Sequence, residues 1–161
     1  MEKPLLKLLH KHCIQQSANP CFQVRTSQLH FLNSPFDYYS ALNKGIEKAS
    51  QRIILSALYM GTGDMEKFLL HQISQRIHSI PYINCTMLFD YNRTMRNNLE
   101  GLIMLNEFRK KHSLQNLEIN LFTHPSSPIL KKIIQYPPVL EAMGVHHIKA
   151  AVFDDDVILT G

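Results

Sequence analysis

A hairpin of two apolar strands joined by an acidic turn is predicted by one stretch of the sequence, His147-Ile148-Lys149-Ala150-Ala151-Val152-Phe153-Asp154-Asp155-Asp156-Val157-Ile158-Leu159-Thr160-Gly161. Because side chains alternate between the two faces of a strand, His147 and Lys149 point to the same side. The apolar run that follows them is typical of a strand buried on both faces. An imidazole and an ammonium on such a strand need a polar or anionic partner, and phosphate is the natural candidate.

The spacing of the hairpin is H-x-K-x-x-x-x-D, with Asp154 in the last place. It resembles the H-K-D motif of the phospholipase D superfamily. In that superfamily a small residue follows the glycine, with an Asn two places later, whereas this sequence stops at Gly161. We therefore expect the chain to be a fragment that carries the first of two such motifs.

Composition is ordinary for one folded domain, with 161 residues, 45% hydrophobic and 19% charged. The formal net charge of +4 favours anionic partners such as phosphates or acidic lipid surfaces, although an ordinary mildly basic surface explains it equally well. Nucleic acid is not an expected partner. Three cysteines without C-x-x-C spacing indicate neither a disulfide framework nor a zinc site, and no other metal site is predicted.

No run approaches the 18 or so apolar residues of a membrane-spanning helix, so any membrane contact is expected to be peripheral. Residues 1–19 form an amphipathic segment, with leucines and lysines on different helical faces. The segment suits a docked helix, an interfacial helix or the remnant of a targeting segment. Residues 20–161 are expected to form a single phospholipase D-like domain, truncated at its C-terminal end.

Strands and helices alternate along this domain, which predicts an α/β fold. Helices are expected to cover a mixed, mostly parallel sheet that finishes in the antiparallel motif hairpin. The expected elements are extended pieces near 22–24 and 29–31, helices at 35–51, 65–78, 99–111 and 129–134, and strands at 52–60, 82–89 and 117–122.

A glycine-containing loop, Gly61-Thr62-Gly63, follows one strand and precedes a helix, where backbone N–H groups favour anions. It lacks the spacing and the lysine of a Walker loop, and a plain tight turn is the alternative interpretation. The stretch Ser56-Ala57-Leu58-Tyr59-Met60-Gly61-Thr62-Gly63 resembles the corresponding part of the eukaryotic phosphatidylglycerophosphate synthases, a phospholipase D subfamily. In that subfamily it is sometimes interpreted as a nucleotide site.

Other pieces occur in the order of that subfamily from about residue 20 onward. They are Ser34 to Leu42, Ala49 to Ile54, Leu88-Phe89-Asp90-Tyr91-x-Arg93, Leu121-Phe122 and Gly144 to Lys149. The resemblance implies transfer of a phosphatidyl group from CDP-diacylglycerol to glycerol 3-phosphate, on the way to cardiolipin. It also implies a mitochondrial protein, peripheral on the inner membrane. No cofactor is expected, since the nucleotide enters as CDP-diacylglycerol, and ATP binding at the loop stays open.

Within this resemblance His147 is the nucleophile that forms a phosphohistidine and releases CMP, and Lys149 neutralises charge in the transition state. Asp154 is expected to fix the motif by hydrogen bonds. His146 points away from His147 and is assigned a structural role. Solvated positions are expected for Asp155, Asp156, Arg93 and Arg96.

The superfamily builds one site from two motifs, and this sequence has one. Three readings follow. The second motif lies in the same full-length chain; or two copies pair, as in single-motif homodimeric nucleases; or the domain binds phosphate without catalysis.

Overall fold

The computed structural model describes residues 24–95, 99–112, 116–123 and 144–161. The chain divides into two units, Met1–Asn33 and Ser34–Gly161. In the described part of the first unit, the 3-10 helix η1 (Thr26–Gln28) is the only regular element. The extended piece expected at 29–31 is therefore not a strand of a sheet, and Phe31 is 87% exposed with no strand pairing. The piece near Phe22 lies mostly outside the described residues, as does the amphipathic segment at 1–19.

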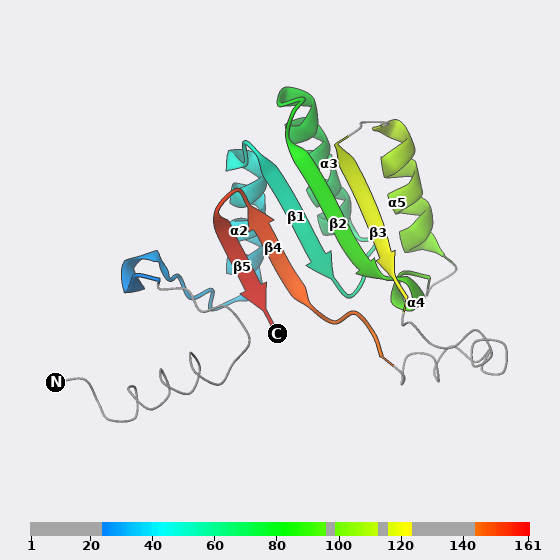
Figure 1. Ribbon diagram of the computed structural model, residues 1–161. Coiled ribbons are helices and arrows are strands. Elements are labelled where there is room, and N and C mark those ends of the chain that lie inside the picture. Colours follow the sequence, from blue (N-terminus) through cyan, green and yellow to red (C-terminus); the bar gives the residue numbers. More distant parts are fainter. Residues whose placement is uncertain (1–23, 96–98, 113–115, 124–143) are drawn as a thin grey trace, which may run out of the picture. The chain divides into compact units, whose positions relative to one another are not determined.

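The second unit is built on a five-stranded sheet in the order β3-β2-β1-β4-β5 (Figure 1). Strands β1, β2 and β3 are parallel, while β4 pairs antiparallel with β1 and β5 pairs antiparallel with β4. This arrangement confirms the predicted mixed α/β fold and its terminal hairpin. The strand bounds are β1 Arg52–Ala57, β2 Asn84–Asp90, β3 Leu117–Phe122, β4 Lys149–Phe153 and β5 Asp156–Thr160.

Three helices, α2 (Pro35–Lys48), α3 (Asp64–Ser79) and α5 (Glu100–Lys111), lie on one face of this sheet (Figure 1). Helix α2 begins as its sequence predicts: Pro35 takes the first turn, and the Asp37 N–H donates to the Ser34 hydroxyl at 3.0 Å. None of the helices in the described ranges is both long enough and apolar enough to cross a membrane.

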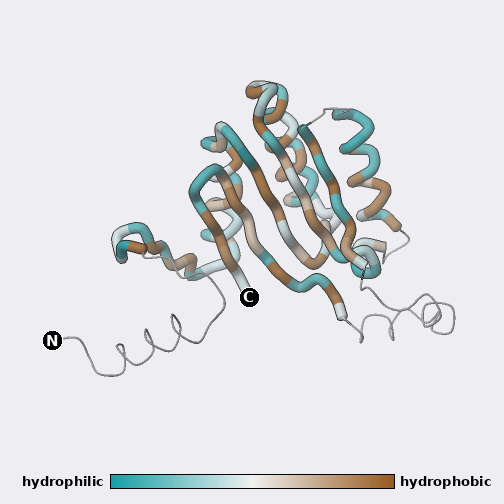
Figure 2. The backbone as a smooth tube through the Cα atoms, viewed as in Figure 1, coloured by the Kyte–Doolittle hydropathy of each residue, from teal (hydrophilic) through white to brown (hydrophobic). Residues whose placement is uncertain are grey.

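The core lies between the sheet and these helices. Hydrophobic residues run along the central strands (Figure 2), and alternate ones such as Ile53 and Met87 are fully buried. Helix α2 approaches β4 closely because Gly45 has no side chain, and a Cβ at that position would overlap the Phe153 ring. Cys85 is buried beneath the helices, and burial raises the pKa of its thiol to about 12.

Strand β4 departs from the expectation of burial on both faces. Ala151 and Phe153 are buried, but Ala150 and Val152, which alternate with them, are only partly covered. The reason is that the described helices pack on one face of the sheet, so the small side chains of the other face stay accessible. The continuous apolar run was therefore a wrong guide to double burial.

Several boundaries also differ. Strand β1 ends at Ala57 instead of Met60, and a short helix, α4 (Tyr91–Thr94), replaces part of the expected polar loop. The Asp90 carboxylate caps this helix by accepting the N–H of Arg93 at 2.9 Å, which explains why the chain turns helical there. The helix expected at 129–134 lies outside the described residues, as does Arg96.

Candidate active site at the carboxyl edge of the parallel strands

The predicted catalytic pair lies where β4 begins. Because β4 runs antiparallel to β1, its first residues lie at the edge where β1, β2 and β3 end, which is the usual ligand-binding edge of α/β sheets. Lys149 is the first residue of β4, so the strand does not include His147. The two side chains nevertheless meet, with the Lys149 Nζ 3.3 Å from the His147 Nε2. The predicted shared side is confirmed.

This contact assigns the lone pair of the imidazole. An ammonium has donors and no acceptor, so the Nε2 of His147 must accept the hydrogen bond from Lys149. The ring proton is then on Nδ1, and Nε2 carries a lone pair directed at the cation. His147 is exposed, so this nitrogen is accessible to a substrate that displaces the ammonium toward its own phosphate oxygens.

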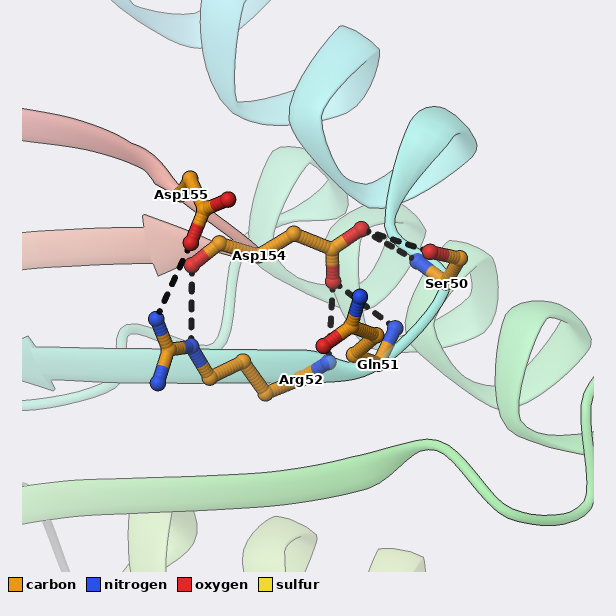
Figure 3. A network of polar contacts seen from close by, with 5 residues as sticks. All are labelled: Ser50, Gln51, Arg52, Asp154 and Asp155. Carbon is orange, nitrogen blue, oxygen red and sulfur yellow. Dashed lines mark hydrogen bonds and ion pairs between the residues drawn. The ribbon is translucent and has the colours of Figure 1, made fainter.

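Asp154 lies at the opposite end of β4, about 16 Å from Lys149 at the rise of an extended strand. Figure 3 shows its carboxylate facing the start of β1, where it accepts the N–H groups of Ser50, Gln51 and Arg52 at 2.8, 2.8 and 2.9 Å and the Ser50 hydroxyl at 2.8 Å. The N–H of Arg52, joined by those of Gln51 and Ser50 and by the Ser50 hydroxyl, holds the pKa of the Asp154 carboxyl well below its usual value, against the opposing effect of burial.

This geometry shows how Asp154 holds the hairpin. Its φ of 53° is the left-handed conformation that Asp tolerates, and the Arg52 side chain donates to its carbonyl oxygen at 2.8 Å. The three residues of the predicted motif therefore lie in two places. His147 and Lys149 meet near the start of β4, whereas Asp154, just after its end, ties the hairpin turn to the start of β1. Asp155, next in the turn, has a fully exposed side chain and one contact to Arg52 at 3.4 Å.

His146 contacts a different set of partners from His147. Its Nε2 lies 2.7 Å from the Ser56 hydroxyl, its backbone N–H donates to the Asp90 carboxylate at 2.9 Å, and its ring centroid is 5.9 Å from that of Phe122. These partners come from the ends of β1, β2 and β3. His146 is thus tied to all three parallel strands, and its structural role stays a prediction.

The glycine-containing loop borders a cavity of about 210 Å³ at the same edge of the sheet. The cavity is lined by Tyr59, Met60, Gly61, Thr62, Arg93, Thr94, Glu100 and Gly101. Ser56 is hydrogen-bonded to His146, and Gly63 precedes the first residue of α3. Arg93, expected in a solvated loop, instead lines this cavity together with part of the candidate stretch, and Glu100 places a carboxylate in the same lining.

Two carboxylates oppose a phosphate at this loop. The Glu66 carboxylate fills the space beside both glycines, because a Cβ would lie 2.5 Å from its Oε1 at Gly61 and 2.7 Å from its Oε2 at Gly63. The Thr62 hydroxyl contacts the Glu100 carboxylate at 3.4 Å. A nucleotide phosphate at this loop would have to displace the Glu66 carboxylate, whose charge opposes it.

Metal ligands are not clustered in the described ranges, where no group of three His, Cys, Asp or Glu side chains is placed to hold an ion. The contacts at this edge that the sequence does not reveal are those of Ser56 and Asp90 with His146. Asp90 carried a usable signal, an Asp between a strand and a helix, which is typical of an N-cap. Ser56 carried none, because its partners lie about ninety residues further along the chain.

The five-stranded sheet and the helices on its face have the fold of a solved structure, phosphatidylserine synthase from Haemophilus influenzae, which matches with a TM-score of 0.66 and 24% identity, over 83% of this chain and 28% of that one. At that identity the match shows the fold. No family model matches the sequence.

The chain is homologous to the CDP-diacylglycerol–glycerol-3-phosphate 3-phosphatidyltransferases. The mitochondrial protein of Gallus gallus is 30% identical over 148 residues, which are 88% of this chain and 26% of that protein. The probable enzyme of Dictyostelium discoideum is 30% identical over 149 residues, which are 90% of this chain and 25% of that protein. This chain therefore spans about a quarter of the length of the curated relatives it matches.

Proposed function

We propose that the chain supplies one catalytic motif of a phosphatidyltransferase that uses CDP-diacylglycerol and glycerol 3-phosphate and yields phosphatidylglycerophosphate and CMP. The observation that carries the proposal is the His147 Nε2 lone pair beside the Lys149 ammonium at the ligand-binding edge of the sheet. The names of the homologues supply the substrates.

In the first step, the Nε2 of His147 attacks the phosphorus that carries the diacylglycerol. A P–N bond forms, the P–O bond to CMP breaks, and CMP leaves with the bonding electron pair. The Lys149 ammonium turns from Nε2 to the non-bridging phosphate oxygens, where negative charge grows in the transition state. This step requires a neutral imidazole with its proton on Nδ1, which is the arrangement that the contact with Lys149 selects.

In the second step, a hydroxyl of glycerol 3-phosphate attacks the same phosphorus, loses its proton and breaks the P–N bond, which restores His147. A second histidine acts as acid for CMP and then as base for this hydroxyl. We propose that it comes from another H-x-K-x-x-x-x-D motif, because the sequence has one such motif and its relatives are about four times as long as the region matched.

No cofactor enters this chemistry, and the nucleotide is carried in as part of CDP-diacylglycerol. We propose a mitochondrial site of action, peripheral on the inner membrane, since relatives named mitochondrial match most of the chain and the donor is a lipid. The net charge of +4 suits an acidic lipid surface. The loop at 56–63 is proposed to border the donor without binding a separate nucleotide.

The test separates oligomeric states by size-exclusion chromatography and assays every fraction with two substrate classes. One is CDP-diacylglycerol in vesicles with glycerol 3-phosphate, and the other is DNA with a simple phosphodiester. We expect product phosphatidylglycerophosphate only where two motifs are paired, and none from the His147→Ala variant. Cleavage of DNA by a defined dimer would favour the single-motif nuclease. Phosphate-ester binding with no turnover even where two motifs are paired would favour a non-catalytic domain.

A further inference from the structure

The nucleophile proposed above lies outside regular structure. His147 is exposed and precedes the first residue of β4, so no ladder hydrogen bond of that strand holds its backbone. The residues on both sides of it are held, however. His146 is bonded through its backbone and its ring, and Ile148 is bonded through its carbonyl.

One hydroxyl makes two of these bonds. The Ser56 Oγ lies 2.7 Å from the His146 Nε2 and 3.2 Å from the Ile148 carbonyl oxygen. A carbonyl only accepts, so both contacts are hydrogen bonds only when the single hydroxyl proton of Ser56 is donated to Ile148. The Nε2–H of His146 then donates to the Ser56 oxygen. This assigns the Nε2–H tautomer to His146, the opposite of the tautomer assigned to His147.

This direction has a chemical consequence. A serine whose proton is committed to a carbonyl, and whose neighbouring imidazole nitrogen is itself protonated, has no base to activate it. Ser56 and His146 are therefore not a nucleophile–base pair, despite their 2.7 Å separation. They form a brace instead, His146 to Ser56 to Ile148, which passes behind His147.

A second anchor comes from β2. Asp90 is 1% exposed, and one carboxylate oxygen accepts the N–H of His146 while the other accepts that of Arg93, both at 2.9 Å. Ser56 is on β1 and Asp90 ends β2, and these strands are paired in register. The brace is thus anchored to two paired central strands. Side chains supported by such regular elements keep their positions to within a fraction of an ångström.

We propose that Ser56 is a positioning residue for His147, acting through His146 and the Ile148 carbonyl to aim the His147 imidazole at Lys149. The kinetic part of this proposal rests on the proposed function. The structural part, the order of the segment that carries His147, does not. Without the hydroxyl, His146 keeps only its bond to Asp90, and the Ile148 carbonyl loses its partner.

The experiment uses the whole chain and ¹⁵N relaxation of its backbone amides. In Ser56→Ala, the order parameter of the His147 amide is expected to fall from about 0.85, the value of rigid backbone, to below about 0.6. Ser56→Thr keeps the hydroxyl and should keep the order. The matched control is Ser79→Ala, which removes a hydroxyl bonded only to the Arg76 carbonyl at the end of α3.

A second variant covers the case in which Ser56→Ala does not fold. His146→Phe keeps a ring against Phe122 and removes the bond to Ser56, so it should disorder His147 in the same way. An unchanged His147 order parameter in a folded variant of either kind would overturn the proposal. So would equal loss of order in Ser56→Thr.

Kinetics provide a separate readout. In a fraction that turns over CDP-diacylglycerol, Ser56→Ala should lower kcat by on the order of a hundredfold at nearly unchanged KM, as expected for a misplaced reacting group. A raised KM at unchanged kcat would contradict positioning. If wild type shows no turnover even where two motifs are paired, the proposed function fails, while the order parameters still decide the role of Ser56.

Discussion

Removing the Asp154 carboxylate should destabilise the domain, because this side chain ties the motif hairpin to the start of β1. Four donors converge on it: the N–H groups of Ser50, Gln51 and Arg52 and the Ser50 hydroxyl. A hydrogen bond to a charged group contributes about 1.5–3 kcal/mol where water is excluded. This turn is partly accessible, so water replaces part of each lost bond, and we expect a total of about 2–4 kcal/mol.

The choice of substitution separates charge from backbone strain. Asp154→Asn tolerates the left-handed conformation but presents an NH₂ group to two donors, and we expect a loss of about 2 kcal/mol. Asp154→Ala loses every acceptor and also the short polar side chain that lets Asp and Asn adopt positive φ, at a further cost of about 1 kcal/mol. Asp154→Gly removes that strain and should fall between these two variants. For a chain of this length, each kcal/mol corresponds to about 2–4 °C in Tm.

The assay is urea unfolding followed by circular dichroism, repeated as a function of pH. Because the folded-state pKa of Asp154 lies below its unfolded value, its stabilisation is present above about pH 4 and is lost as the pH falls below that. The gap between wild type and Asp154→Asn should therefore close on acidification. Asp155→Asn is the matched control, and loss of its fully exposed contact to Arg52 should leave the stability nearly unchanged.

The reasoning would be refuted if Asp154→Asn were as stable as wild type, or if Asp155→Asn were equally damaging. An Asp154→Asn protein with full stability and no transfer activity would show that Asp154 acts in the reaction and does not stabilise the hairpin.

Three further predictions concern the core and the site. Gly45→Ala should destabilise the domain by about 1–3 kcal/mol, because the added methyl overlaps the Phe153 ring, and chemical denaturation measures this loss. Burial, with His78 and Lys111, lowers the pKa of His112, so the unfolded state binds the extra proton and stability should fall as the pH decreases through about 6.5; His112→Phe should flatten that part of the pH–stability curve. Lys149→Met should lower kcat by a hundredfold or more with Tm nearly unchanged, and a raised KM alone would assign Lys149 to ground-state binding.

Local patterns predicted much of this structure. The N-terminus of α2 follows from Ser34 and Pro35, since caps and first-turn prolines act within a few residues. The shared side of His147 and Lys149 follows from strand alternation, which continues to the two residues that precede the start of β4. The hairpin turn at Asp154 follows from the three acidic residues that separate two apolar runs.

The rest depends on which strands become neighbours. The bond between Ser56 and His146 joins β1 to the segment before β4, and no periodicity in either segment indicates that pairing. The sequence is equally silent on the position of the described helices on one face of β4, because the apolar run 150–153 is compatible with helices on one face or on both. The Glu66 carboxylate beside Gly61 is a third case, since the loop sequence alone suggested an anion site and the fold places an anion of its own there.

The central claim is that the Nε2 of His147 is the nucleophile, and trapping its phosphatidyl adduct tests this most directly. The chain would be incubated with CDP-diacylglycerol vesicles without glycerol 3-phosphate, then digested and analysed by mass spectrometry under alkaline conditions, with CMP release followed in parallel. Without a second histidine as acid the step should be slowed by about a hundredfold or more, so the incubation runs for hours. We predict at most one phosphatidyl group per chain, on the peptide that contains His147, with equimolar CMP, and none in His147→Ala. An adduct on another residue, or an adduct that persists in His147→Ala, would contradict the account.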